Sequence, residues 1–196
     1  MVGINSTAVA STEISGGADV ERPELFRARI LERIRRPPHG GDSDDYVAWA
    51  KEVPGVTRAW CTPNGMGAGT VVVRFVRDDD EDPIPDAGEI EAVRAHIEAQ
   101  RPATAELFVP LSVAKPVAYV ISDLQPDTAE IRAAIVAELK DMHVRDAIPG
   151  GTLLVSHMRE AISIAAGEND HVLVSPAGNV TCLPGELATF GGVTWV

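Results

Sequence analysis

Histidine has the widest chemical range of the residue types in this sequence, because imidazole binds metals and transfers protons near neutral pH. The five histidines are His39, His96, His143, His157 and His171. They form neither an HxH nor an HExxH pattern, so they indicate no metal site that is local in the sequence. A site would need several side chains to meet in space, and the best-placed set is His143, Asp146, His157 and His171. A metal-dependent or hydrolytic enzyme is therefore one hypothesis, and stabilisation of a helix end by His143 is the simpler interpretation.

A run of acidic residues, Asp78–Asp82, is a second candidate site. Asp78, Asp80, Asp82 and Glu89 occupy positions 1, 3, 5 and 12 of a calcium-binding loop. The sixth position carries Pro83, where that loop needs glycine for a sharp turn. We favour a solvated loop or a charged contact patch, and keep a small cation-binding module as an alternative.

The glycine-rich stretch Gly65-x-Gly67-x-Gly69 resembles a phosphate-binding loop, but such a loop needs a helix directly behind it. A β-rich run follows here, so the spacing predicts a hairpin turn. Cys61 and Cys182 lie far apart in alternating segments, and we expect both to be reduced core thiols. The GxSxG motif of hydrolases is absent. The residues alone therefore indicate no active site and no cofactor.

Composition and charge exclude several classes of protein. The chain has 196 residues, of which 45% are hydrophobic and 23% charged, the balance of a globular protein. A formal net charge of -12 repels nucleic-acid phosphates and anionic lipids. Apolar stretches fall short of the about 20 residues that a membrane-spanning helix needs, and the start does not resemble a signal peptide. We expect a soluble intracellular protein with neither nucleic acid nor a membrane as partner.

The N-terminal part of the chain shows a helical apolar period. Residues 1–20 are small and polar and read as a lead-in, and residues 21–55 are expected to form a helical hairpin. Its first helix, about 23–36, starts at Pro23 and ends before Pro37-Pro38. Ser43 is expected to cap the second helix, which buries Trp49 and ends at Pro54-Gly55.

The period then alternates, which predicts two small α+β units, and the fold class is α+β. Residues 56–110 are expected to form a ββαβ unit and residues 115–196 a βααβββ unit. The expected strands are 56–61, 70–76, 105–109, 117–121, 171–175, 179–183 and 190–195, and a short helix is expected near 156–166. The connector from Pro110 to Pro116 is the candidate hinge between the units.

One pattern occurs twice in the chain. Pro85-Asp86-x-x-Glu89-Ile90-x-Ala92 returns as Pro126-Asp127-x-x-Glu130-Ile131-x-Ala133. In each copy the spacing predicts a capping box, in which the aspartate is the N-cap of a helix and the glutamate reaches back to it. The repeat arose either by duplication of a strand–helix unit or by two independent uses of the same cap.

A series of short motifs in a fixed order resembles the baseplate J-like proteins of contractile phage tails. The motifs are Gly16-Gly17-Ala18-Asp19-x-Glu21, Arg27-x-Arg29, Pro37, Gly40-Gly41, Asp45-Tyr46-x-x-Trp49-Ala50, Val53-Pro54-Gly55-Val56, Gly67-x-Gly69-Thr70-Val71, Arg101-Pro102, Pro149-Gly150-Gly151, Arg159-Glu160-Ala161-Ile162 and Val193-Thr194-Trp195. The likeness covers nearly the whole chain from about residue 15, as the C-terminal portion of a family member. Members usually carry a further N-terminal domain, so residues 1–20 are expected to be a remnant of it.

The resemblance implies a structural, non-catalytic wedge protein that assembles around the hub of a six-fold baseplate. Its partners would be other wedge and hub proteins and copies of itself. It would reside in the virion, and in the host cytoplasm during assembly. Trp195, near the end of the sequence, is expected either to close the second core or to serve as an interface residue.

Overall fold

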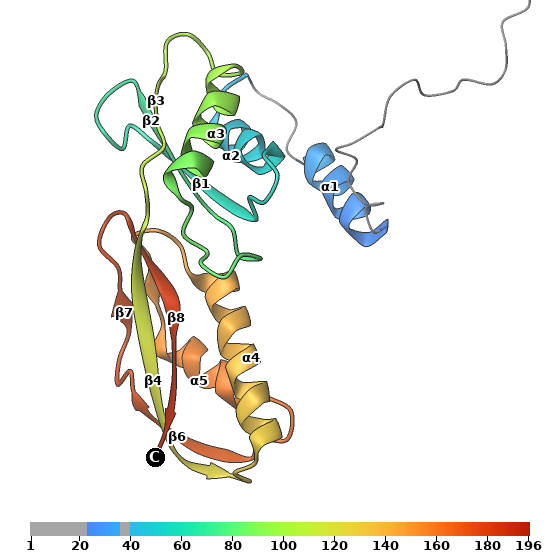
Figure 1. Cartoon of the computed structure of the whole chain (residues 1–196), viewed down its shortest axis with the longest axis vertical. Coiled ribbons are helices and arrows are strands. Elements are labelled where there is room, and N and C mark those ends of the chain that lie inside the picture. Colours follow the sequence, from blue (N-terminus) through green and yellow to red (C-terminus); the bar gives the residue numbers. More distant parts are fainter. Residues whose placement is uncertain (1–22, 36–39) are drawn as a thin grey trace, which may run out of the picture. The chain divides into compact units, whose positions relative to one another are not determined.

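The computed structural model describes residues 23–35 and 40–196 of the chain (Figure 1). The chain divides into two compact units, Met1–Pro38 and His39–Val196. The described part of the first unit is helix α1 (Pro23–Arg35). Phe26, Ile30 and Ile34 are exposed and recur every four residues, so they form an apolar stripe along α1. Among the described residues, no helix has the length and apolar character needed to cross a membrane.

The elements from α2 to β3, here called the central module, form the first part of the second unit. They are α2 (Ser43–Glu52), β1 (Arg58–Pro63), β2 (Thr70–Val76), α3 (Ala87–Glu98) and β3 (Glu106–Phe108). Strand β2 lies between the other two, antiparallel to β1 and parallel to β3. Helix α3 provides the crossover that a parallel pair requires.

The core of the central module lies between this sheet and helices α2 and α3. Its buried members are Tyr46, Ala50, Ala59, Val73, Phe75, Val93, Ile97 and Val109. Trp49 is half-buried and meets Tyr46 edge to face, with ring centroids 5.0 Å apart. The N-cap of α2 is Asp42, whose carboxylate accepts from the Asp45 amide, so the expectation of a Ser43 cap is wrong. The pairing of α1 with α2 in a hairpin stays a prediction, because the two helices belong to different units.

The elements from β4 to β8, here called the C-terminal module, form the rest of the second unit. They are β4 (Val113–Gln125), α4 (Ala129–Asp146), β5 (Thr152–Leu153), α5 (Val155–Ser163), β6 (Asp170–Ser175), β7 (Val180–Thr181) and β8 (Glu186–Trp195). The main sheet has the order β6-β4-β8, with β4 antiparallel to β6 and parallel to β8. Figure 1 shows α4 running beside this sheet. The short strands β5 and β7 form a separate pair.

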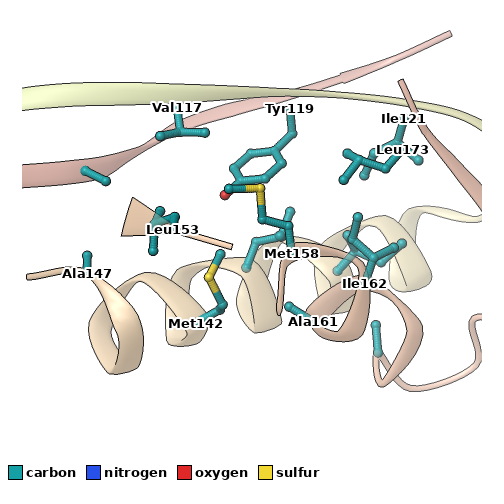
Figure 2. Close-up of a cluster of buried hydrophobic side chains, with 14 of the residues drawn as sticks. Val117, Tyr119, Ile121, Met142, Ala147, Leu153, Met158, Ala161, Ile162 and Leu173 are labelled. Atoms are coloured by element: carbon teal, nitrogen blue, oxygen red, sulfur yellow. The ribbon is translucent and has the colours of Figure 1, made fainter. Parts of the chain in front are cut away.

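A second, larger core fills the space between this sheet and helices α4 and α5. Side chains of Val117, Tyr119 and Ile121 on β4 point toward the two helices in Figure 2. Met142 of α4 and Met158 of α5 approach them from the other side, and both are fully buried. Alternate β4 positions such as Ala118 are exposed, so β4 has one buried and one exposed face.

The structure confirms the mixed α+β class and corrects several details of the expected elements. Strand β4 begins at Val113, and Pro116 lies inside it opposite Thr189 of β8. The expected bounds of the connector, Pro110 to Pro116, are therefore wrong, because the connector between the modules is residues 109–112. Its role as a hinge stays a prediction. The two-residue strand β5 is an element that the sequence pattern does not predict.

The repeated sequence pattern starts two helices in two different ways. At α3 the predicted capping box is present: the Glu89 amide donates to Asp86 Oδ1 and the Asp86 amide donates to Glu89 Oε2, each over 2.8 Å. At α4 the expected Asp127 cap is wrong. Thr128 is the N-cap, and Asp127 instead accepts two hydrogen bonds from Arg132.

Candidate functional site

The described histidines do not converge on one site. His96 pairs with Glu52, and His171 pairs with Glu168, over 2.9 and 2.8 Å. Of the expected set, Asp146 and His157 do meet, at 2.9 Å between Oδ2 and Nδ1. Within residues 23–35 and 40–196, no three His, Cys, Asp or Glu side chains are grouped so that they could hold a metal ion. His39 lies outside the described residues, and the arrangement of the others does not favour the enzyme hypothesis.

His143 is a buried structural residue in the last turn of α4. Its Nε2 lies 2.8 Å from Tyr119 Oη, and its Nδ1 lies 3.3 Å from the carbonyl oxygen of Ala188. Burial lowers the pKa of His143, and burial also raises the pKa of Tyr119. A neutral imidazole accepting from Tyr119 and donating to Ala188 satisfies all three groups. His143 therefore ties α4 to β4 and β8.

The acidic run after β2 is organised by arginines. Arg58 holds Asp78 through two hydrogen bonds of 2.8 and 2.7 Å. Arg77 pairs with Asp80 and with Glu89. Asp78, Asp80 and Glu89, three of the four candidate calcium ligands, thus already pair with arginines. This arrangement favours a charged structural loop over a cation site.

The glycine-rich stretch is the predicted hairpin turn between β1 and β2. The Asn64 amide donates to Thr70 O over 2.7 Å, and the Gly69 amide donates to the Asn64 side chain over 3.1 Å. The backbone amides thus serve the turn. Cys61 and Cys182 are both free thiols, and burial raises the pKa of each, so neither thiol is activated.

Two of the family-motif glycines have a positive φ and close neighbours inside the central module. A Cβ at Gly41, whose φ is +116°, would lie 2.5 Å from Pro102 Cγ, so two motif residues from different segments pack together. A Cβ at Gly55, whose φ is +90°, would lie 2.2 Å from Nη1 of Arg77. At both positions the positive φ would strain a residue with a side chain; the proline ring at Gly41 adds a clash, whereas the end of the Arg77 side chain could move away from Gly55. These motif residues fix turns and packing.

The remaining family-motif residues have structural surroundings where they are described. Tyr46 and Trp49 belong to the central core, Pro54 accepts from Arg77, Gly67 and Gly69 shape the β1–β2 turn, Arg101 pairs with Glu98, and Gly150 and Gly151 form the turn before β5. Arg27 is exposed on α1, and Arg29 lies in the same helix. Gly16, Gly17, Asp19, Glu21 and Pro37 lie outside the described residues. Trp195 is half-buried against the C-terminal core, with the Arg132 guanidinium 5.1 Å from its ring centroid.

Arg58 is an important residue that the sequence analysis missed. It begins β1, and its Nη1 donates to the carbonyl oxygen of Ala147, the C-cap of α4, over 2.9 Å. It thus joins the central module to the C-terminal module. A charged residue in an alternating strand ordinarily indicates the solvent face, which is why the pattern did not single it out.

Comparison with protein-family models gives two matches that together span most of the chain. Residues 38–110 match the Baseplate J-like central domain. Residues 118–196 match the Baseplate J-like protein C-terminal domain. The first matched region contains the elements of the central module, and the second contains those of the C-terminal module except the start of β4, which begins at Val113.

Three curated proteins are similar to nearly the whole chain. Protein JayE of Escherichia coli (strain K12) is 46% identical over 194 residues, which are 98% of this chain and 73% of that protein. The Mu-like prophage FluMu protein gp47 of Haemophilus influenzae (strain ATCC 51907 / DSM 11121 / KW20 / Rd) is 37% identical over 206 residues, covering 100% of this chain and 57% of that protein. The baseplate protein gp47 of Escherichia phage Mu is 34% identical over 201 residues, 97% of this chain and 56% of that protein. The chain therefore spans little more than half the length of either gp47 protein. It belongs to the Baseplate J-like family.

Proposed function

We propose that this chain is a structural component of a contractile phage tail baseplate, a wedge protein that assembles around the hub. The observation that carries this proposal is the agreement of two family models along the chain with 34% identity to a protein named as a baseplate protein of phage Mu. The two gp47 relatives extend well beyond the matched region, so the role concerns the central and C-terminal part of such a protein.

The chemistry of the described residues supports a structural role. The described carboxylates and histidines form pairs that stabilise loops and helix ends. The described family-motif glycines form turns and close packing contacts. We infer that the chain is not an enzyme and uses no cofactor. Its partners in this proposal are other wedge and hub proteins and copies of itself, with neither nucleic acid nor a membrane among them.

The domain organisation that accompanies this role keeps the predicted divisions. We propose a lead-in over residues 1–20, a helical hairpin over residues 21–55, and two α+β units over residues 56–110 and 115–196. The two separate cores support the last division. One observation favours placing the boundary at residue 55 before α2 instead: α2 buries Tyr46 and Ala50 in the core of the central module. The protein would act in the virion tail, after assembly in the host cytoplasm.

Affinity capture tests the proposal directly. The tagged chain is expressed in cells that produce the corresponding phage or prophage particles, and the co-purifying proteins are identified by mass spectrometry. We expect other baseplate components to be enriched. The matched control is the same chain carrying Gly41→Val, which should disrupt the contact with Pro102 and lower the recovery of those components.

Purified particles provide the second arm of the experiment. The proposal predicts that intact tails contain this polypeptide in a constant ratio to the other baseplate proteins. Complete, contractile tails from which the polypeptide is absent would overturn it.

A further inference from the structure

The sheet of the central module packs on both of its faces. Strand β1 is paired with β2 so that Arg58 lies opposite Val76 and Trp60 lies opposite Arg74. Because side chains alternate along a strand, these four residues share one face. The intervening positions, among them Phe75, lie in the core of the central module. The face of Arg58 and Trp60 therefore points away from that core.

That second face meets the C-terminal module. Val76 is completely buried within the C-terminal core, although it belongs to β2. Trp60 and Ile84 are half-buried and also pack against the C-terminal core. The two modules therefore share an apolar interface. The chain that connects them is short, residues 109–112.

Arg58 adds a hydrogen bond between the modules beside this apolar interface. Its Nε and Nη2 bind both oxygens of Asp78, and its Nη1 donates to Ala147 O at the C-terminal end of α4. Thr57 Oγ1 donates to Asp78 over 2.5 Å, and the Arg58 guanidinium lies 5.1 Å from the Trp60 ring centroid. Burial raises the pKa of Asp78, but the bonds from Arg58 and Thr57 outweigh it and hold the pKa below its usual value. The carboxylate is thus charged and fixes the guanidinium for its contact with α4.

Two buried polar atoms at the same junction between the modules have no hydrogen-bond partner among the described residues. These atoms are Arg74 Nε and Ser112 Oγ. Both adjoin Gly185: Arg74 Nη2 lies 3.4 Å from the position of a Cβ there, and the amide of Val113, next to Ser112, donates to Gly185 O. Separating the two modules would return these atoms to water. Their desolvation therefore offsets part of the free energy that the modules gain by burying apolar side chains against each other.

We propose that Arg58 is a latch between the two modules: held by Asp78, it ties β1 to the end of α4 and fixes the orientation of the modules, and its release allows them to move about residues 109–112. The device is independent of the baseplate role. In a baseplate it would let one wedge protein switch between two shapes, because among the described residues the C-terminal core would lose Val76, Trp60 and Ile84 alone, while the core of the central module would stay intact.

Hydrogen–deuterium exchange of the full chain tests the latch. Arg58→Ala should raise amide exchange about tenfold in the connector and in the last turn of α4, as expected on loss of hydrogen bonds to a charged group. Exchange in the interior of α3 and in the first half of α4 should stay unchanged. The matched control is Arg94→Ala, which removes an arginine bound to Glu91 within α3 alone and should leave the connector unaffected.

A second variant separates the latch from the fold of the central module. Arg58→Lys keeps a charge beside Asp78, so β1 and β2 should remain protected, but one ammonium group cannot span Asp78 and Ala147 O together. It should give the Arg58→Ala pattern at smaller amplitude. Unchanged exchange at the connector in both variants, or a rise spread evenly over the central module, would overturn the proposal. Neither result would bear on the baseplate capture experiment.

Discussion

The middle strands of the two modules differ in how many faces they bury. Strand β4 alternates, with Val117, Tyr119 and Ile121 inside and residues such as Ala118 exposed. Strand β2 is buried or half-buried at every position, because the C-terminal module covers the face that its own helices leave open. A nearly continuous apolar run in a strand is thus a sign of cover on both sides. The comparison shows that the two modules are folded against each other, not merely connected.

The two modules also begin their main helices differently from the same residues. Asp86 is the N-cap of α3 within a complete capping box, whereas α4 starts one residue later at a Thr128 cap. At the second copy, Arg132 binds the aspartate that the pattern assigns to the cap. A short motif therefore predicts the position of a helix start to within one turn. Which residue becomes the N-cap depends on whether a neighbouring charge binds the aspartate.

The largest effect should come from the C-terminal core. Leu139→Ala removes a completely buried side chain of α4 and should lower the free energy of unfolding by about 2–5 kcal/mol. Urea denaturation followed by circular dichroism measures the change. Leu183→Ala is the control of equal chemistry, because Leu183 is largely exposed and its loss should be nearly neutral. Equal costs for both variants would mean that α4 does not close this core.

A smaller loss is expected in the central core. Trp49→Ala removes a half-buried ring that meets Tyr46 edge to face, so the cost should be about 2 kcal/mol, below the 3–5 kcal/mol of a fully buried aromatic residue. The same denaturation experiment reports it. A cost above that of Leu139→Ala would mean that the Trp49 ring contributes more to stability than a half-buried side chain should.

The two helix starts should respond unequally to the same substitution. Asp86→Ala removes the acceptor of the Glu89 amide, Asp86 Oδ1, and should lower the free energy of unfolding by about 1 kcal/mol. Asp127→Ala removes an exposed pair with Arg132 and should change the melting temperature less, while Thr128→Ala should resemble Asp86→Ala. Differential scanning calorimetry of the three variants checks this order. Equal shifts for Asp86→Ala and Asp127→Ala would restore the equivalence that the sequence predicts.

The smallest effect concerns pH and is confined to the C-terminal module. Burial keeps the pKa of His143 below its usual value, with Arg58 lowering it and Asp146 and the bond to Ala188 raising it. Below about pH 6.5 the unfolded chain binds a proton that the folded chain does not, so stability should fall as the pH falls from 7 to 5. His143→Gln should flatten that dependence in urea denaturation series. An unchanged slope would mean that His143 takes up its proton without loss of the bond to Tyr119.

Much of the fold follows from the sequence because its signals are local. The run Thr70–Val76 predicts β2 with its observed bounds, and the apolar period after Asp86 predicts α3. Strand β5 could not be predicted, because two residues carry no period and the pairing with β7 depends on distant chain. The sequence pattern predicts the start of β4 too late, because Pro116 normally indicates a connector, although a strand accepts proline at positions where the missing amide has no role in pairing.

The residues at the junction could not be predicted from local patterns. Arg58 and Ala147 are far apart in sequence, and no periodicity relates the start of a strand to the end of a helix in another module. Local patterns also do not show whether the histidines meet in space, so a shared site was possible from the sequence. The fold instead pairs His157 with Asp146 and His171 with Glu168. The family motifs were recognisable because glycine and proline positions mark turns that each segment needs locally.

The central claim, that this chain is a structural part of a baseplate, is tested most directly by cryo-electron microscopy of the tail particles produced with it. The account predicts density for the central and C-terminal modules in the baseplate, repeated by its symmetry, with Arg58 against the end of α4 in at least one state of the tail. A baseplate resolved throughout, with every density assigned to other polypeptides, would contradict it.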